Sequence, residues 1–150
     1  MTLAARIIAH AKKRKPDFQI GGKKRPYIDR WYVIPRNPLF NTYIHHMQRD
    51  DDDRALHDHP WWNLSIILSG GYFEHMPDRV EWRGVGQWVL RRASAAHRLA
   101  LKDHVNSWSL FITGPRIREW GFWCKHGWVH WKDFTDPSDS GAIGPGCGEE

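Results

Sequence analysis

The strongest constraint on the fold is a series of short apolar and aromatic segments that glycine and proline interrupt at close intervals. Segments of strand-like composition cover 27–34, 40–47, 63–68, 72–76, 79–83, 87–91, 107–113, 118–124 and 128–134. In segment 107–113, for example, Trp108 and Leu110 fall on one face of an extended chain. About ten short strands joined by Gly and Pro turns predict an all-β jelly roll or small barrel.

One segment has a helical pattern instead. Thr2 can cap a helix over residues 2–15, in which apolar residues recur at helical spacing, namely Leu3, Ile7, Ile8 and Ala11. The basic run 12–15 suits a helix C-terminus, and Pro16 ends the helix. We expect this helix to lie against the outside of the β core, or alternatively to serve a dimer contact.

The chain of 150 residues suits one domain. We expect a helical segment at 1–18 appended to a β-barrel domain at 19–134. Residues 135–150 are dominated by Pro, Ser, Gly and Asp, which predicts a flexible tail. The two cysteines, Cys124 and Cys147, are too few for a disulfide framework.

The net charge of +5 is concentrated in two basic runs near the N-terminus, 12–15 and 23–25. Such runs can attract nucleic acid, but no nucleic-acid-binding motif accompanies them, so we expect a solvated arm and no nucleic-acid partner. The chain has no apolar run near the length of a membrane span and no signal-peptide pattern. These features predict a cytoplasmic protein that does not contact a membrane.

Two histidines one residue apart are the first candidates for chemistry. His57 and His59 share a face if the chain is extended, because side chains alternate across a strand. Two imidazoles on one face can bind one metal ion together, and a third ligand must come from elsewhere. His97 is the candidate for that third ligand.

At these positions the chain resembles the cupin superfamily. Its first motif is matched by His57-x-His59, three residues, Asn63, six residues and Gly70; its second is matched by Gly86, five residues, Arg92-x-Ser94, two residues and His97. The sequence departs from the motifs at several positions. In the first motif, Asp51 replaces the first Gly and Asn63 replaces the Glu ligand. In the second motif, Arg92 and Ser94 replace Pro and Gly, and Leu101 replaces Asn.

The resemblance implies a cupin double-stranded β-helix, or jelly-roll barrel, with a short N-terminal α-helix. It implies a metal held by His57, His59 and His97. Loss of the Glu ligand leaves a three-histidine set, which is similar to cysteine dioxygenase and other three-histidine cupin oxygenases that bind iron(II). Three neutral ligands also leave the metal its full charge, which favours an anionic substrate. Imidazole suits zinc and nickel as well, so the ligand set does not identify the metal.

Further residues are candidates for a small-molecule pocket: Tyr43, His45, Asn63 and Trp108. Glu74 is the nearest downstream carboxylate and a rival fourth ligand. A second cluster, Cys124-x-His126-x3-His130, has the residues of a zinc fragment but lacks a fourth ligand outside the tail.

The leading hypothesis is a mononuclear non-heme iron dioxygenase that acts on a small organic molecule. One alternative is a cupin that binds a small molecule or metal without turnover. Another is a sugar isomerase or epimerase; however, its His–Asp base is not supplied by His57 and Asp58, because adjacent strand residues point to opposite faces. The aromatic edge segments also allow a homodimer.

Overall fold

The computed structural model describes residues 1–22, 24–51, 55–139, 142 and 144–148. Within these ranges the chain forms twelve strands and two helices, and all strand pairs are antiparallel. The chain therefore has the all-β architecture that the segment pattern predicts.

The largest sheet has six strands in the order β1-β2-β3-β10-β5-β8. These are β1 (Phe18–Ile20), β2 (Ile28–Tyr32), β3 (Asn41–Met47), β10 (Ser107–Thr113), β5 (Asn63–Ser69) and β8 (Trp88–Arg91). The central strand β10 pairs with β3 on one side and with β5 on the other. Neighbours in this sheet are thus brought together from distant parts of the sequence.

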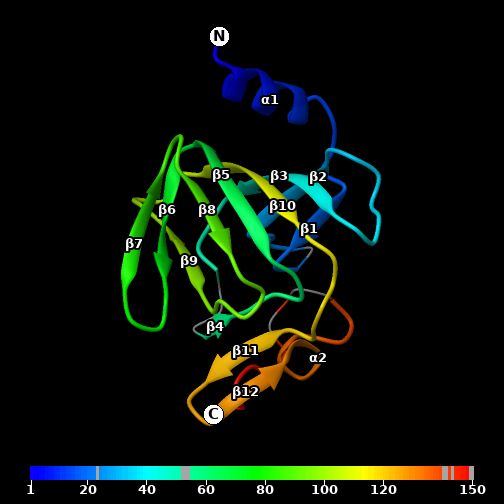
Figure 1. The fold of residues 1–150 in the computed structure, drawn as a ribbon, viewed down its shortest axis with the longest axis vertical. Coiled ribbons are helices and arrows are strands. Elements are labelled where there is room, and N and C mark those ends of the chain that lie inside the picture. The colour runs from blue at the N-terminus through cyan, green and yellow to red at the C-terminus, as the bar shows by residue number, and fades with distance from the viewer. Residues whose placement is uncertain (23, 52–54, 140–141, 143, 149–150) are drawn as a thin grey trace.

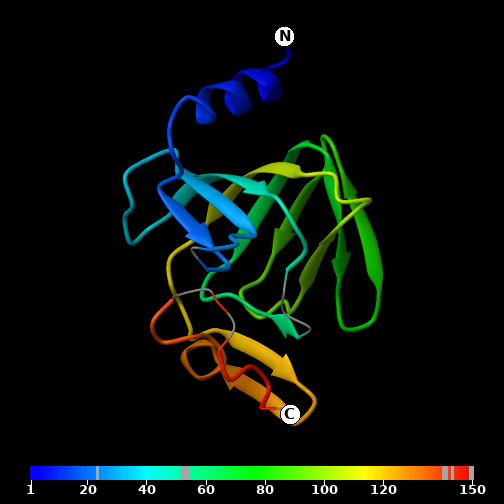
Figure 2. The ribbon, with the colours of Figure 1, turned by 180° about the vertical axis from the view of Figure 1, so that it is seen from behind.

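Two three-stranded sheets complete the fold, in the orders β7-β6-β9 and β12-β11-β4. Their strands are β7 (Val80–Gly84), β6 (Gly71–His75), β9 (Arg98–Leu101), β12 (Gly127–His130), β11 (Gly121–Cys124) and β4 (Leu56–His57). Figures 1 and 2 show the large sheet and the β6 sheet as the walls of a barrel, with β11 and β12 at one end. This double-stranded β-helix confirms the predicted fold class.

The short helix α1 (Leu3–Ala11) lies at the opposite end of the molecule from the β11–β12 hairpin (Figure 1). Its N-terminus is capped by Thr2, whose Oγ1 accepts a hydrogen bond from the backbone N–H of Ala5 at 3.2 Å. Ala11 packs against Trp31 and Trp108 on the outer face of the six-stranded sheet. The external position of the predicted helix is therefore confirmed, although the helix ends at Ala11 rather than at residue 15.

The interior of the barrel contains a cluster of apolar side chains from both walls: Ile28, Met47, Ile67, Tyr72 and Leu101. Burial of such side chains contributes about 1.5–3 kcal/mol each. Leu101 belongs to β9, a strand that the segment pattern does not predict.

The C-terminal part forms a separate aromatic cluster. Phe122 on β11 stacks on Phe134 of the short helix α2 (Trp131–Phe134), with ring centroids 3.7 Å apart. The predicted strand 128–134 is therefore divided between β12 and α2.

Cys124 and Cys147 are joined by a disulfide, with their Cα atoms 5.6 Å apart. A count of two cysteines does not predict this bond. It attaches the segment after α2 to β11, and Gly144 and Gly146 also donate backbone hydrogen bonds to the carbonyl of Phe134. Flexibility of 135–150 stays a prediction, and residues 140, 141, 143, 149 and 150 lie outside the described residues. The cytoplasmic location also stays a prediction, although disulfides are more typical of oxidising compartments.

None of the helices in the described ranges combines the length and apolar character needed to cross a membrane.

Candidate metal centre

Three histidines from two separate parts of the chain, 57–59 and 97, converge on one centre. His57 ends β4, and an isolated bridge pairs it with His97, with both backbone N–H···O=C distances at 2.9 Å. His59 lies two residues further along, on the same side of the chain. One nitrogen of each ring falls within 4.8 Å of the others. The structure thus brings together the three residues that the motif spacing singles out.

The imidazole nitrogens have distinct inner and outer partners. Nε2 of His59 and Nε2 of His97 are 2.9 Å apart, so these atoms face a common centre. On the outer side, Nδ1 of His97 lies 2.7 Å from Oε1 of Glu74, and Nδ1 of His57 lies 3.3 Å from Oδ2 of Asp51. Outer carboxylates of this kind orient metal-binding imidazoles in many proteins.

Burial keeps the imidazoles of His59 and His97 neutral near pH 7. Desolvation lowers the pKa of His97 to about 4, although the hydrogen bond with Glu74 acts in the opposite direction. Desolvation, followed by the neighbouring His57 and His97, lowers the pKa of His59 well below its ordinary value. Neutral imidazoles carry the lone pairs that metal coordination needs, so the residues fit a divalent metal ion.

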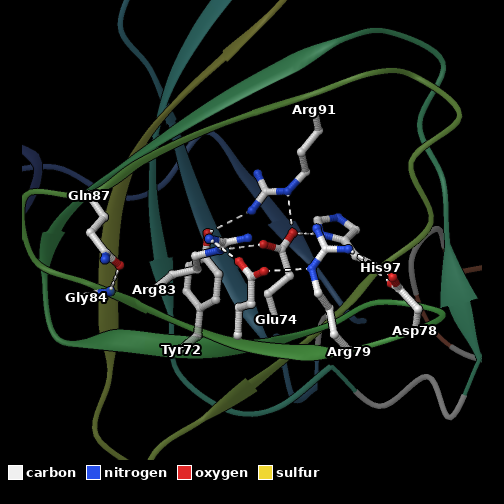
Figure 3. Close-up of polar contacts among 10 residues, drawn as sticks. Tyr72, Glu74, Asp78, Arg79, Arg83, Gly84, Gln87, Arg91 and His97 are labelled. Atoms are coloured by element: carbon white, nitrogen blue, oxygen red, sulfur yellow. Dashed lines mark hydrogen bonds and ion pairs between the residues drawn. The ribbon is translucent and has the colours of Figure 1, made fainter.

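Glu74 is the centre of a buried ion-pair network (Figure 3). Arg91 Nε donates to its Oε1 at 2.5 Å, and Arg83 Nε donates to its Oε2 at 2.7 Å. Burial alone would raise the pKa of Glu74, but the hydrogen bonds with His97 and Arg91 lower it far below its ordinary value. The carboxylate therefore stays ionised although it is only 1% exposed.

The histidine triad opens onto a cavity of about 310 Å³. That volume is at the lower end of the range for small-molecule sites. Its lining includes an aromatic wall made by Trp61, Phe111, Trp120 and Trp131, together with the polar side chains of Arg30 and His45. Trp61 also stacks on His59, with ring centroids 5.0 Å apart.

Arg30 places a guanidinium group in this cavity. Its Nε donates to Nε2 of His45 at 2.8 Å, and its Cζ lies 4.5 Å from the centroid of the Tyr43 ring. Burial and the charge of Arg30 lower the pKa of His45 well below its ordinary value, so His45 accepts as a neutral ring. In the described part of the chain, no carboxylate lies within ion-pair distance of Arg30.

The predicted pocket residues occupy different places. His45 lines the cavity, and Tyr43 stacks beside it with ring centroids 6.0 Å apart. Asn63 is fully buried and accepts from Arg91 Nη1 at 3.2 Å. Trp108 lies on the other face of β10, where it stacks on Trp31 beneath α1, so, contrary to the prediction, it does not line the cavity. Alternate residues of β10 face the cavity instead, among them Phe111.

The alternative zinc cluster is not assembled. Cys124 is bonded to Cys147 in the disulfide and cannot act as a ligand, and Nε2 of His130 lies 2.8 Å from Oε2 of Glu119. Asp58 points away from the triad, as alternation requires, and its Oδ2 accepts from the indole N–H groups of Trp123 and Trp128.

Sequence reasoning contains no signal for the roles of Asp51, Arg30 and Arg91. It indicates Glu74 only as a rival ligand, whereas in the structure Glu74 contacts the outer nitrogen of His97. The predicted strands contain many charged residues, and only the pairing of the strands reveals which of these side chains contact one another.

No family model matches this chain, and no curated protein sequence is significantly similar to it. Several solved structures are similar in fold. The DMSP lyase DddQ from Ruegeria pomeroyi superposes with a TM-score of 0.61 and 14% identity, covering 91% of this chain and 72% of DddQ.

Two further structures share the fold. The iron(II) form of HppE gives a TM-score of 0.56 and 14% identity over 67% of this chain and 57% of HppE. A Klebsiella pneumoniae protein with a double-stranded β-helix domain gives a TM-score of 0.52 and 16% identity, covering 65% of this chain and 88% of the Klebsiella chain. Likeness at this identity establishes the double-stranded β-helix fold. The triad adds a histidine group able to hold a metal ion.

Proposed function

We propose that this chain is a metal-dependent cupin enzyme, in which His57, His59 and His97 hold one divalent ion. Iron(II) is the favoured metal, and the favoured reaction is dioxygenation of a small organic anion. The observation that carries the proposal is the convergence of three buried or half-buried imidazoles on one centre at the wall of a cavity. A three-histidine set leaves coordination positions open, which catalysis needs.

When bound, the metal supplies Lewis acidity and, if it is iron, the one-electron chemistry that dioxygen requires. The residues of the chain have separate tasks. Arg30 binds the anionic group of the substrate, because its guanidinium has hydrogen-bond donors beyond the one given to His45. The aromatic side chains Trp61 and Phe111 hold the organic part and exclude water.

One of the similar structures supports metal chemistry on this fold, and together they do not decide the reaction. HppE is described in its iron(II) form, which favours iron, whereas DddQ is a lyase and matches a larger share of this chain. A metal-dependent lyase is therefore the second candidate. The two reactions differ in a measurable way, since only the dioxygenase consumes oxygen.

The test begins with the metal content of the purified protein, reconstituted with iron(II) without oxygen. We expect about one equivalent in the wild type, on the basis of one site with three ligands. The variant His97→Ala should lose the ion, and His126→Ala should keep it, because His126 lies outside the triad. Equal metal content in both variants would contradict the site.

Oxygen uptake with small carboxylates and thiols then separates the two reactions. Uptake that needs both iron and an anionic compound supports the dioxygenase. Turnover of such a compound without oxygen consumption supports the lyase instead. A protein that binds iron and turns over none of these compounds would favour the binding cupin.

A further inference from the structure

Glu74 lies directly behind His97, on the side away from the common centre. Its Oε1 is 2.7 Å from Nδ1 of His97, whereas Nε2 of the same ring faces His59. A neutral imidazole carries one proton, and a carboxylate at Nδ1 holds that proton there. The Nε2 lone pair is then available at the centre.

Arg91 and Arg83 fix Glu74 in this position (Figure 3). Arg91, from β8, donates to Oε1, and Arg83, from β7, donates to Oε2. The carboxylate cannot turn toward the centre without breaking charged hydrogen bonds in a buried site, which are stronger than neutral ones. Glu74 is therefore held as a partner of His97 and kept from acting as a fourth ligand.

Arg91 holds a second group in the same way. Its Nη1 donates to Oδ1 of Asn63 at 3.2 Å and to Oγ of Ser65 at 2.9 Å. Asn63 stands where the cupin motif has its Glu ligand, so the side chain at that position is directed to Arg91. One arginine thus engages both the motif position on β5 and the carboxylate on β6.

We propose that Glu74 is a positioning residue of the metal centre. It supplies, from behind His97, the negative charge that the cupin motif supplies at the position of Asn63, and Arg91 holds both groups off the metal. This inference rests on the proposed metal site and assigns residues that the motif does not contain. The competing explanation is a purely structural ion-pair network that joins β6, β7 and β8.

The test uses Glu74→Gln in the metal-free protein, with Co(II) alone as the probe. Glutamine has a similar size but no charge, and its amide oxygen can take the place of Oε1 as the acceptor for Nδ1 of His97 and Nε of Arg91. We expect Co(II) affinity to fall about 10- to 100-fold, the usual effect of losing an outer-sphere partner. In ¹H–¹⁵N spectra of the metal-free protein, the Nδ1 proton of His97 should move upfield, because a neutral amide oxygen accepts a weaker hydrogen bond than a carboxylate.

The matched control is Arg83→Gln, which breaks the same network at the other carboxylate oxygen. It leaves Oε1 on His97, so stability should fall while Co(II) affinity and the signal of the His97 Nδ1 proton stay as in the wild type. If Glu74→Gln does not fold, Glu74→Asp replaces it: the shorter carboxylate withdraws from Nδ1, and an intermediate loss of affinity is expected.

The outcomes separate this inference from the function proposed above. If the wild type binds Co(II), His97→Ala does not, and Glu74→Gln binds normally, the positioning role is overturned and the metal site stands. Equal losses of affinity in Glu74→Gln and Arg83→Gln also overturn it, because both would then follow from stability. No Co(II) binding by the wild type overturns the metal site itself.

Discussion

The two faces of the six-stranded sheet differ in what they do, although the same strands supply both. On β3 and β10, Ile44 and Trp108 point outward and are covered by α1 through Ala11. The next residues along these strands, His45 and Ser109, point into the cavity. One face is a packing surface, and the other is lined by groups that can bind a ligand.

The difference shows how the barrel separates stability from chemistry. Aromatic side chains on the outer face stack on one another, and their burial stabilises the fold whether or not a ligand is bound. Arg30 on the inner face is half-buried and has no carboxylate partner among the described residues, which costs stability but leaves its charge available to a ligand. Substitutions on the two faces should therefore affect different measurements.

The largest expected effect is on the outer face. Trp108 is 6% exposed and stacks on Trp31 and His46, so Trp108→Ala should lower the free energy of unfolding by about 3–5 kcal/mol. Denaturant unfolding followed by circular dichroism measures it. Metal content should stay at the wild-type value. A folded variant that has lost its metal would show that the two faces are not independent.

A slightly smaller effect is expected at the C-terminal edge of the cavity. The disulfide closes a loop with a sequence separation of 23, and replacing both Cys124 and Cys147 by Ser should cost about 3 kcal/mol. Hydrogen exchange should accelerate in β11, β12 and α2, because these elements form the cluster that contains both cysteines. Exchange in α1 should not change. Uniform acceleration would mean that the outer face depends on this bond.

On the inner face, Arg30→Met should change binding more than folding. Benzoate serves as the probe with the metal-free protein, so that the carboxylate reports on Arg30 alone. Loss of a charged hydrogen bond, about 1.5–3 kcal/mol, predicts Kd to be weaker by about 10- to 150-fold in calorimetry. Thermal stability should be unchanged or higher. Arg36→Met removes an equal charge from the surface, and an equal loss of affinity there would contradict a role for Arg30.

Periodicity alone recovers much of this architecture. The segments 40–47 and 107–113 coincide closely with β3 and β10, because β-branched and aromatic residues alternate there and Gly or Pro limits the ends. Motif spacing likewise singles out His57, His59 and His97, which the barrel brings to one centre. Strand alternation depends only on neighbouring residues, and the motif spacing is defined relative to glycines at turns. Both patterns can therefore be recognised in a single sequence.

Two kinds of feature lie beyond such signals. The alternation of side chains along a strand leaves open which face is inside. The strand pattern predicts that Trp108 lines the pocket, but its neighbours in β10 occupy that side instead. Contacts such as Glu74 with Arg91 depend on which strands pair across the barrel, and charge alone does not single them out. The disulfide likewise depends on the fold of the chain after α2, which polar composition does not reveal.

The smallest expected effect concerns pH and tests the inner face away from the triad. Burial, and then the charge of Arg30, lower the pKa of His45 below its ordinary value of 6.5, so the unfolded chain binds a proton more readily than the folded chain. Stability of the metal-free protein should therefore fall as the pH drops below about 6.5, by up to about 1.4 kcal/mol per pH unit for this one group. His45→Gln still accepts from Arg30 but does not titrate, so its stability should decline less steeply over the same interval. Chemical denaturation at several pH values measures both slopes. Parallel slopes would mean that His45 takes up its proton over the same pH range in the folded and the unfolded protein, which contradicts a lowered pKa of His45.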